Sequence, residues 1–166
     1  MRLLAVSAVT SDLPVVADHP DNLTALAKAA QAAGQTLQIM VDIDVGSRRT
    51  GVPSAQQATA LAQQVEAAAN LSLVGIQGYA GGLQHIYDWD ERVRRGQDVA
   101  DFLIEVRRQL AGAGITPPVF SGGGTGTHAI DHSQGILNEL QAGSYVFLDV
   151  DYQRVAHTGD AANRFR

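Results

Sequence analysis

The chain has 166 residues, of which 45% are hydrophobic and 17% charged, and its formal net charge is −5. This length suits one domain with a sizeable core, and the composition excludes a disordered chain. The acidic balance and an aromatic content of 5% exclude a nucleic-acid-binding surface, and no apolar run reaches the roughly 18 residues that span a membrane. Cysteine is absent, which excludes disulfides and thiolate chemistry, and we expect a cytoplasmic protein.

The first part of the chain contains a helix end, a strand and a helix. Residues 1–8 have the pattern of a helix end, although one positive charge, an apolar run and small residues also fit a very short signal peptide. Residues 13–17 predict a short buried strand. Asp21 or Asn22 predicts the cap of a helix that ends at Gly34.

The alternation of strand and helix continues through the middle of the chain. The predicted elements are a strand over 37–43, a helix from the capping box of Ser54 and Gln57 to about Ala69, a strand over 71–79, a polar loop over 80–90, a long helix that Gly112 and Gly114 stop, and a fourth strand opened by Pro117 and Pro118.

An apolar run within residues 139–152 predicts a fifth strand. Right-handed crossovers between strands then imply an α/β fold in which helices pack outside a parallel sheet. Ligands of such sheets bind at the C-terminal ends of the strands, where the unusual loops of this chain also fall. The prediction places Arg49, Tyr79, His85 and the loop 122–127 around one mouth.

The loop 122–127, Gly-Gly-Gly-Thr-Gly-Thr, has the composition of an anion-binding loop. Glycines let the backbone approach a phosphate closely, successive N–H groups can converge on its oxygens, and Thr125 and Thr127 add hydroxyl donors. The alternative is a flexible turn. No Gly-Lys-Ser/Thr follows the glycines, so this is not a Walker loop.

Two weaker patterns overlap this loop. Residues 124–129 match the looser dinucleotide pattern, with Asp149 and Asp151 about 20 residues further on, so a dinucleotide-binding oxidoreductase is one alternative function. His128 and His132 are spaced to share a helical face, but no third metal ligand is evident.

Four side chains near the predicted mouth each have two interpretations, one as a functional group and one as an ordinary structural residue. Arg48 and Arg49 could bind a phosphate or carboxylate, or form surface ion pairs. Tyr79 could present its hydroxyl to a ligand or lie at the edge of the core. His85 is a candidate general base, although a single loop histidine is more often only solvated.

Segments 44–51, 75–81 with Gln84 and His85, 121–127 and 139–152, in this order, resemble the D-threonine aldolase group. This group includes D-3-hydroxyaspartate aldolases and D-serine dehydratases, and it belongs to the alanine-racemase-like pyridoxal-phosphate enzymes. The resemblance implies a (β/α)8 barrel and the retro-aldol cleavage of a D-3-hydroxy amino acid to glycine and an aldehyde. It implies pyridoxal 5′-phosphate as the cofactor, bound by Arg49, Tyr79, Gly122, Gly123, Gly124, Thr125, Gly126, Thr127 and Tyr145.

The resemblance covers residues 13–152, and two features of the group have no match. The group's cofactor-binding lysine lies on the first barrel strand, and its divalent-metal ligands lie in a C-terminal β-domain. Lys28 is the only lysine and falls in a predicted helix, so it is not carried over. A closed barrel typically needs about 250 residues. We therefore interpret residues 1–166 as one partial pyridoxal-phosphate-binding barrel domain, about strands four to eight of an incomplete TIM-type barrel.

This interpretation predicts a fragment without catalytic activity, in which no catalytic residue and no metal ligand is assigned. The implied partner is a small D-3-hydroxy amino acid, with no nucleic acid or membrane partner. The alternative is a non-catalytic half-barrel interaction module. Open sheet edges predict a homo-oligomer or aggregation, which a monodisperse monomer in light scattering would contradict.

Overall fold

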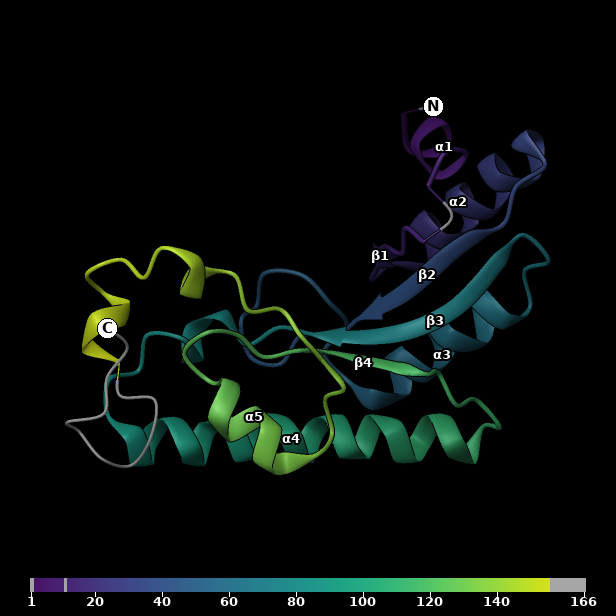
Figure 1. Ribbon diagram of the computed structural model, residues 1–166. Helices are drawn as coiled ribbons and strands as arrows, with labels where there is room; N and C mark the ends of the chain where they lie inside the picture. The colour runs from purple at the N-terminus through teal and green to yellow at the C-terminus, as the bar shows by residue number, and fades with distance from the viewer. Residues whose placement is uncertain (1, 11, 156–166) are drawn as a thin grey trace.

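The computed structural model describes residues 2–10 and 12–155, which form a five-stranded sheet in the order β1-β2-β3-β4-β5 (Figure 1). The strands are β1 (Val15–Ala17), β2 (Leu37–Asp42), β3 (Leu71–Gly78), β4 (Val119–Gly122) and β5 (Glu139–Leu140). All neighbouring pairs are parallel. A strand order that follows the sequence is that of a β/α barrel wall, here as an open sheet, so the predicted fold class is confirmed.

Helices pack on one face of this sheet. They are α1 (Arg2–Ser7), α2 (Pro20–Ala33), α3 (Ala55–Glu66), α4 (Trp89–Gly112) and α5 (His128–Gln134). Figure 1 shows α3 below β3, and α4 and α5 below both β3 and β4. The core between the two layers is apolar, and it includes the fully buried Ile39, Val65 and Val106.

Local signals in the sequence located several helix ends. Residues 2–7 are helical, as predicted. The Ser54 hydroxyl caps α3 by accepting the N–H of Gln57 at 3.3 Å, also as predicted, although the helix ends at Glu66 instead of near Ala69. Gly34 ends α2 in the left-handed conformation, with φ of 64°.

The predicted cap of α2 is wrong. The helix is capped by His19, whose ring Nδ1 accepts the N–H of Asp21 at 3.2 Å. Pro20 takes the first helical position, where its fixed φ is suitable and an N–H is not needed. The helix therefore begins before Asp21 and Asn22, which lie inside its first turn.

The C-terminal apolar run departs furthest from the prediction. Only Glu139 and Leu140 pair with β4, and the chain then continues through two 3-10 turns, Ser144–Val146 and Tyr152–Arg154. Leu148 has a φ of 43°, which an extended strand does not allow. As a result Phe147 is 93% exposed instead of buried in the sheet.

Within the described residues, no helix layer covers the face of the sheet opposite the helices. A cavity of about 560 Å³ lies on it and is lined by residues of all five strands. In the described residues β1 and β5 each pair on one side only, so the open edges are present and association through them stays a prediction. None of the helices described has the length and apolar content to cross a bilayer.

We expect Gly75→Ala to destabilise the fold by about 1–3 kcal/mol, because its methyl group would overpack the sheet. That group would lie 2.8 Å from Cε of Met40 and 2.9 Å from the carbonyl oxygen of Val119. The control is Gly112→Ala, which meets no atom within 4 Å and should change stability by about 1 kcal/mol or less. Urea unfolding measures both, and equal midpoints would contradict the packing argument.

Candidate functional site

The glycine loop, residues 122–127, lies at the C-terminal end of β4 and is buried throughout. The hydroxyl of Thr127 accepts the N–H of Gly124 at 3.1 Å and Nε2 of Gln84 at 3.0 Å. Oε1 of Gln84 accepts the N–H of Gly126 at 2.8 Å. Side chains of the same chain therefore fix the shape of the loop, which does not fit the flexible-turn interpretation.

Close backbone contacts explain the glycines of this loop. A Cβ at Gly122 would lie 2.4 Å from the carbonyl oxygen of Gly78, and one at Gly126 would lie 2.3 Å from that of Gln84. Gly123 has a φ of 61°, which most other residues avoid. The glycines thus pack the loop against β3 and the turn that follows β3.

The loop after β2 presents Arg49. The Asp44 carboxylate accepts the N–H of Arg48 at 2.9 Å, and this bond is the main reason that the pKa of Asp44 is lowered. At the other end of the loop, the N–H of Gly51 donates to Asp18 at 3.0 Å. Both ends are therefore fixed, while Arg49 itself is exposed.

The structure brings Tyr79 within electrostatic reach of Arg49. Burial raises the pKa of Tyr79 and Tyr152 raises it further, whereas the charge of Arg49 lowers it. Tyr145 meets the glycine loop through its backbone, whose N–H donates to the Thr125 hydroxyl at 3.1 Å, and the residue is 60% exposed.

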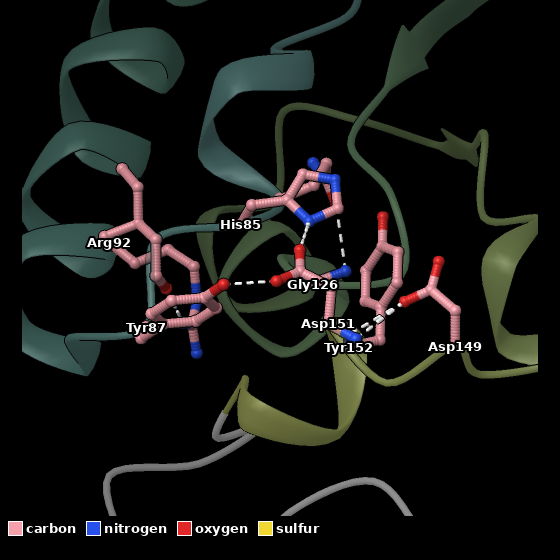
Figure 2. A network of polar contacts seen from close by, with 9 residues as sticks. His85, Tyr87, Arg92, Gly126, Asp149, Asp151 and Tyr152 are labelled. Carbon is pink, nitrogen blue, oxygen red and sulfur yellow. Dashed lines mark hydrogen bonds and ion pairs between the residues drawn. The ribbon is translucent and has the colours of Figure 1, made fainter.

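A polar cluster joins the loop after β3 to the C-terminal segment (Figure 2). One carboxylate oxygen of Asp151 accepts the Tyr87 hydroxyl, and the other contacts Nδ1 of His85. Asp149 accepts the N–H groups of Asp151 and Tyr152, each at 3.0 Å. The hydrogen bonds from Tyr87 and then His85 lower the pKa of Asp151, so this carboxylate is ionised at neutral pH.

Two arginines contact the residues of this cluster or their backbone. Arg92 on α4 is fully buried, and its Nη1 donates to the carbonyl oxygen of Ile86, between His85 and Tyr87. Burial lowers the pKa of Arg92. The guanidinium of Arg154 lies 4.6 Å from the centre of the Tyr87 ring.

A chain of five polar side chains crosses the uncovered face of the sheet, and sequence reasoning missed it. Gln77 donates to Asp42 at 3.2 Å, and Gln141 donates to Gln77 at 3.2 Å and to Ser121 at 2.9 Å. The Ser121 hydroxyl donates to Glu139 at 2.6 Å. The sequence did contain a signal for this chain of side chains, because β2, β3 and β4 each carry a polar residue at or next to the C-terminal end, near the predicted mouth.

The structure does not bring His128, His132 and Lys28 together in one site. Nδ1 of His128 lies 3.0 Å from the carbonyl oxygen of Thr125, and His132 is exposed. Residues 2–10 and 12–155 hold no group of three or more His, Cys, Asp or Glu side chains placed to bind a metal ion. Lys28 is exposed on α2.

The dinucleotide alternative does not fit the sheet. Dinucleotide-binding sheets bind their ligand where the strand order reverses, and the order described here runs from β1 to β5 without reversal. The carboxylate of Asp149 also accepts two backbone N–H groups of its own segment.

The fold and these loops match proteins of known family. Residues 4–151 match the family described as alanine racemase, N-terminal domain. The chain belongs to this family. The predicted resemblance to the aldolase group within it is confirmed by a 3-hydroxy-D-aspartate aldolase of Paracoccus denitrificans, 36% identical over 93% of this chain, and by a D-threonine aldolase of Arthrobacter sp., 34% identical over 92%.

Solved structures agree with this alanine-racemase family assignment. The crystal structure of D-threonine aldolase from Filomicrobium marinum matches with a TM-score of 0.91 and 35% identity, over 98% of this chain and 44% of that one. D-threo-3-hydroxyaspartate dehydratase from Delftia sp. HT23 shares the fold, with a TM-score of 0.80 over 90% of this chain and 40% of that one, and 23% identity. The chain spans 40% of the length of the curated aldolases.

We expect Asp131→Asn to remove a pH dependence of stability. Asp131 accepts the Thr127 hydroxyl at 2.5 Å, and burial raises the pKa of its carboxyl group. The folded state therefore keeps this proton to higher pH than the unfolded chain, whose pKa is near 3.8. The contribution of Asp131 to the free energy of unfolding is therefore full below about pH 3.8, and it is lost as the pH rises through the pKa of Asp131 in the folded state.

Urea unfolding between pH 3.5 and 7 measures this effect, with the exposed Asp98→Asn as the control. The wild type and the control should lose stability relative to Asp131→Asn as the pH rises. Parallel pH profiles for all three proteins would contradict the assignment.

Proposed function

We propose that this chain is the cofactor-holding part of a pyridoxal-phosphate-dependent aldolase that cleaves D-3-hydroxy amino acids. The main support is that Arg49, Tyr79, His85 and the glycine loop converge at one end of a parallel sheet. Tyr79 interacts electrostatically with Arg49 and Tyr152, the His85 ring lies against Tyr152, and Gln84, next to His85, bonds to Gly126 of the loop. The aldolases named above support the reaction class.

The glycine loop fits a phosphate in part. The N–H groups of Gly124, Gly126 and Thr127 already donate within the chain. A phosphate bound at the loop would therefore take its hydrogen bonds from other donors, among them those of Gly123 and Thr125. The Thr125 hydroxyl accepts a backbone N–H, so its own proton can still be donated to an anion.

We assign Arg49 and Tyr79 to the ring of the cofactor or its oxygen substituents. Arg49 is exposed and lies on a fixed loop, so a negatively charged group can pair with it without rearrangement of the backbone. Tyr79 is half-buried, and burial raises its pKa, so it stays a neutral hydrogen-bond donor at neutral pH.

We assign His85 as the proton acceptor for the 3-hydroxyl of the substrate. The ionised Asp151 holds the Nδ1–H of the ring, which leaves the Nε2 lone pair to take that proton as the C2–C3 bond breaks and the C3–O bond becomes a carbonyl. Pyridoxal phosphate held by these residues would supply the electron sink for the pair left on C2.

We further propose that the isolated chain has no turnover. Covalent attachment of the cofactor needs a lysine amine at the site. Lys28 is the only lysine of the chain, and it is exposed on α2 in the helix layer. The implied divalent metal has no candidate cluster in the part of the chain that is described.

Titration with pyridoxal 5′-phosphate, followed by absorbance, should show saturable binding. Arg49→Ala should weaken it about tenfold or more, because a charge-assisted hydrogen bond of about 1.5 kcal/mol or more is lost. Arg108→Ala is the matched control, since Arg108 is exposed on α4 and pairs with Glu105.

Borohydride reduction and mass analysis of the peptides complete this experiment. We expect no stoichiometric attachment to Lys28 and no cleavage of D-threonine that follows the chain concentration. Stoichiometric attachment there would overturn the proposed inactivity, whereas a failure to bind the cofactor at all would overturn the assigned site.

We expect the neutral ring of His85 to be the Nδ1–H tautomer, because Asp151 accepts that proton. Asp151→Asn should shift the ring toward the Nε2–H form. The ¹⁵N chemical shifts of the ring nitrogens measure both, with the exposed His132 as the reference in the same spectrum. An Nε2–H ring at His85 in the wild type would rule out its assigned role.

A further inference from the structure

We infer that Gln84 is the positioning residue that holds the glycine loop and His85 in one geometry, so that a phosphate bound at the loop also restrains His85. The inference deepens the proposed function and rests on it for the identity of the anion. Gln84 is 1% exposed and ends the 3-10 turn Gly81–Leu83 that follows β3.

Both polar atoms of the Gln84 amide are hydrogen-bonded, and Nε2 uses both of its protons. Its Nε2 donates to the Thr127 hydroxyl at 3.0 Å and to the carbonyl oxygen of Ala80 at 3.4 Å, and its Oε1 accepts the N–H of Gly126 at 2.8 Å. Exchanging the amide oxygen and nitrogen would place two donors together and two acceptors together, so this network allows one orientation only. The side chain therefore specifies a single position of the loop relative to β3.

The Thr127 hydroxyl uses its one donor and both of its acceptor positions. It accepts from Gln84 and from the N–H of Gly124, and it donates to Asp131 on α5. A buried network with all positions filled behaves as a unit, and the loss of one member leaves other groups unpaired at a cost of about 1–3 kcal/mol each. Gln84 is the member that comes from the loop after β3.

The residue next to Gln84 is His85, whose ring belongs to the polar cluster of Figure 2. There Nδ1 contacts Asp151, and the ring centre lies 4.8 Å from that of Tyr152. The two consecutive residues thus bind different partners: Gln84 binds the glycine loop, and His85 contacts the C-terminal segment. A shift of the loop must move Gln84, and the peptide bond transmits that movement to His85.

Gln84→Met tests the inference, because methionine has a similar length and no hydrogen-bonding amide. The matched control is Gln97→Met, at an exposed position on α4. The probe is inorganic phosphate, and the readout is the ¹³Cε1–¹Hε1 signal of His85, which His85→Asn identifies among the five histidines. In the wild type and the control, this signal should move as phosphate saturates.

In Gln84→Met, phosphate affinity should fall about tenfold or more, and the His85 signal should no longer respond to phosphate. A variant that keeps both the affinity and the response would overturn the inference. Gln84→Glu, which keeps the acceptor for Gly126 and loses both donors, should give the same result if the methionine variant does not fold.

Measurements without phosphate separate this inference from the proposed function. The N–H of Gly126 should exchange its hydrogen with solvent slowly in the wild type. Gln84→Met should speed this exchange and shift the His85 signal recorded without phosphate, whereas Gln97→Met should change neither. If these changes occur and phosphate binds to none of the proteins, the loop is not a phosphate site although Gln84 is a positioning residue. Rapid exchange at Gly126 in the wild type would overturn the role of Gln84.

Discussion

Contact between the backbone of the glycine loop and the backbone at the end of β3 is the constraint on which the site depends. Gly122 lies against the carbonyl oxygen of Gly78, and Gly126 lies against that of Gln84, at separations that leave no space for a side chain. Because the approach is this close, one amide side chain reaches both the loop and its neighbouring turn. The arrangement of the loops around the site follows from that contact.

Carboxylates hold the remaining loops in place by accepting backbone N–H groups. Asp44 and Asp18 fix the loop that presents Arg49, and Asp149 fixes the turn that presents Asp151. A carboxylate that accepts such bonds is stabilised in its charged form, as the lowered pKa of Asp44 shows. The acidic residues of these loops thus act as structural acceptors, and Arg49 stays exposed on one of them.

The features that could be predicted from the sequence have local physical causes. Ser54 caps its helix through a bond that spans three residues, and Gly34 ends the preceding helix through its own backbone conformation. The alternation of strands and helices is sufficient for the parallel sheet, and hence for the end at which Arg49, Tyr79 and His85 lie.

The features that were missed depend on partners distant in sequence. The apolar residues near Phe147 read as a strand, but β5 pairs only over two residues and the backbone of Tyr145 bonds to Thr125 instead. Gln84 is one polar residue in a polar loop, and its burial becomes evident only when the glycine loop, some forty residues later, is packed against it. Pairing of His85 with Asp151 spans a still longer separation, |i−j| of 66.

The order of the strands bears on how this site can be inherited. Each strand neighbours the one before and the one after it in the chain, so the contacts of a loop fall mostly on adjacent loops. Residues 71–155 hold Tyr79, the glycine loop with Gln84, and the pair of His85 and Asp151, whereas Arg49 comes from the preceding loop. One uninterrupted segment thus contains both the glycine loop and the polar cluster. A recombination or duplication that copied this one segment would therefore carry the glycine loop and the polar cluster together, without the loop that presents Arg49.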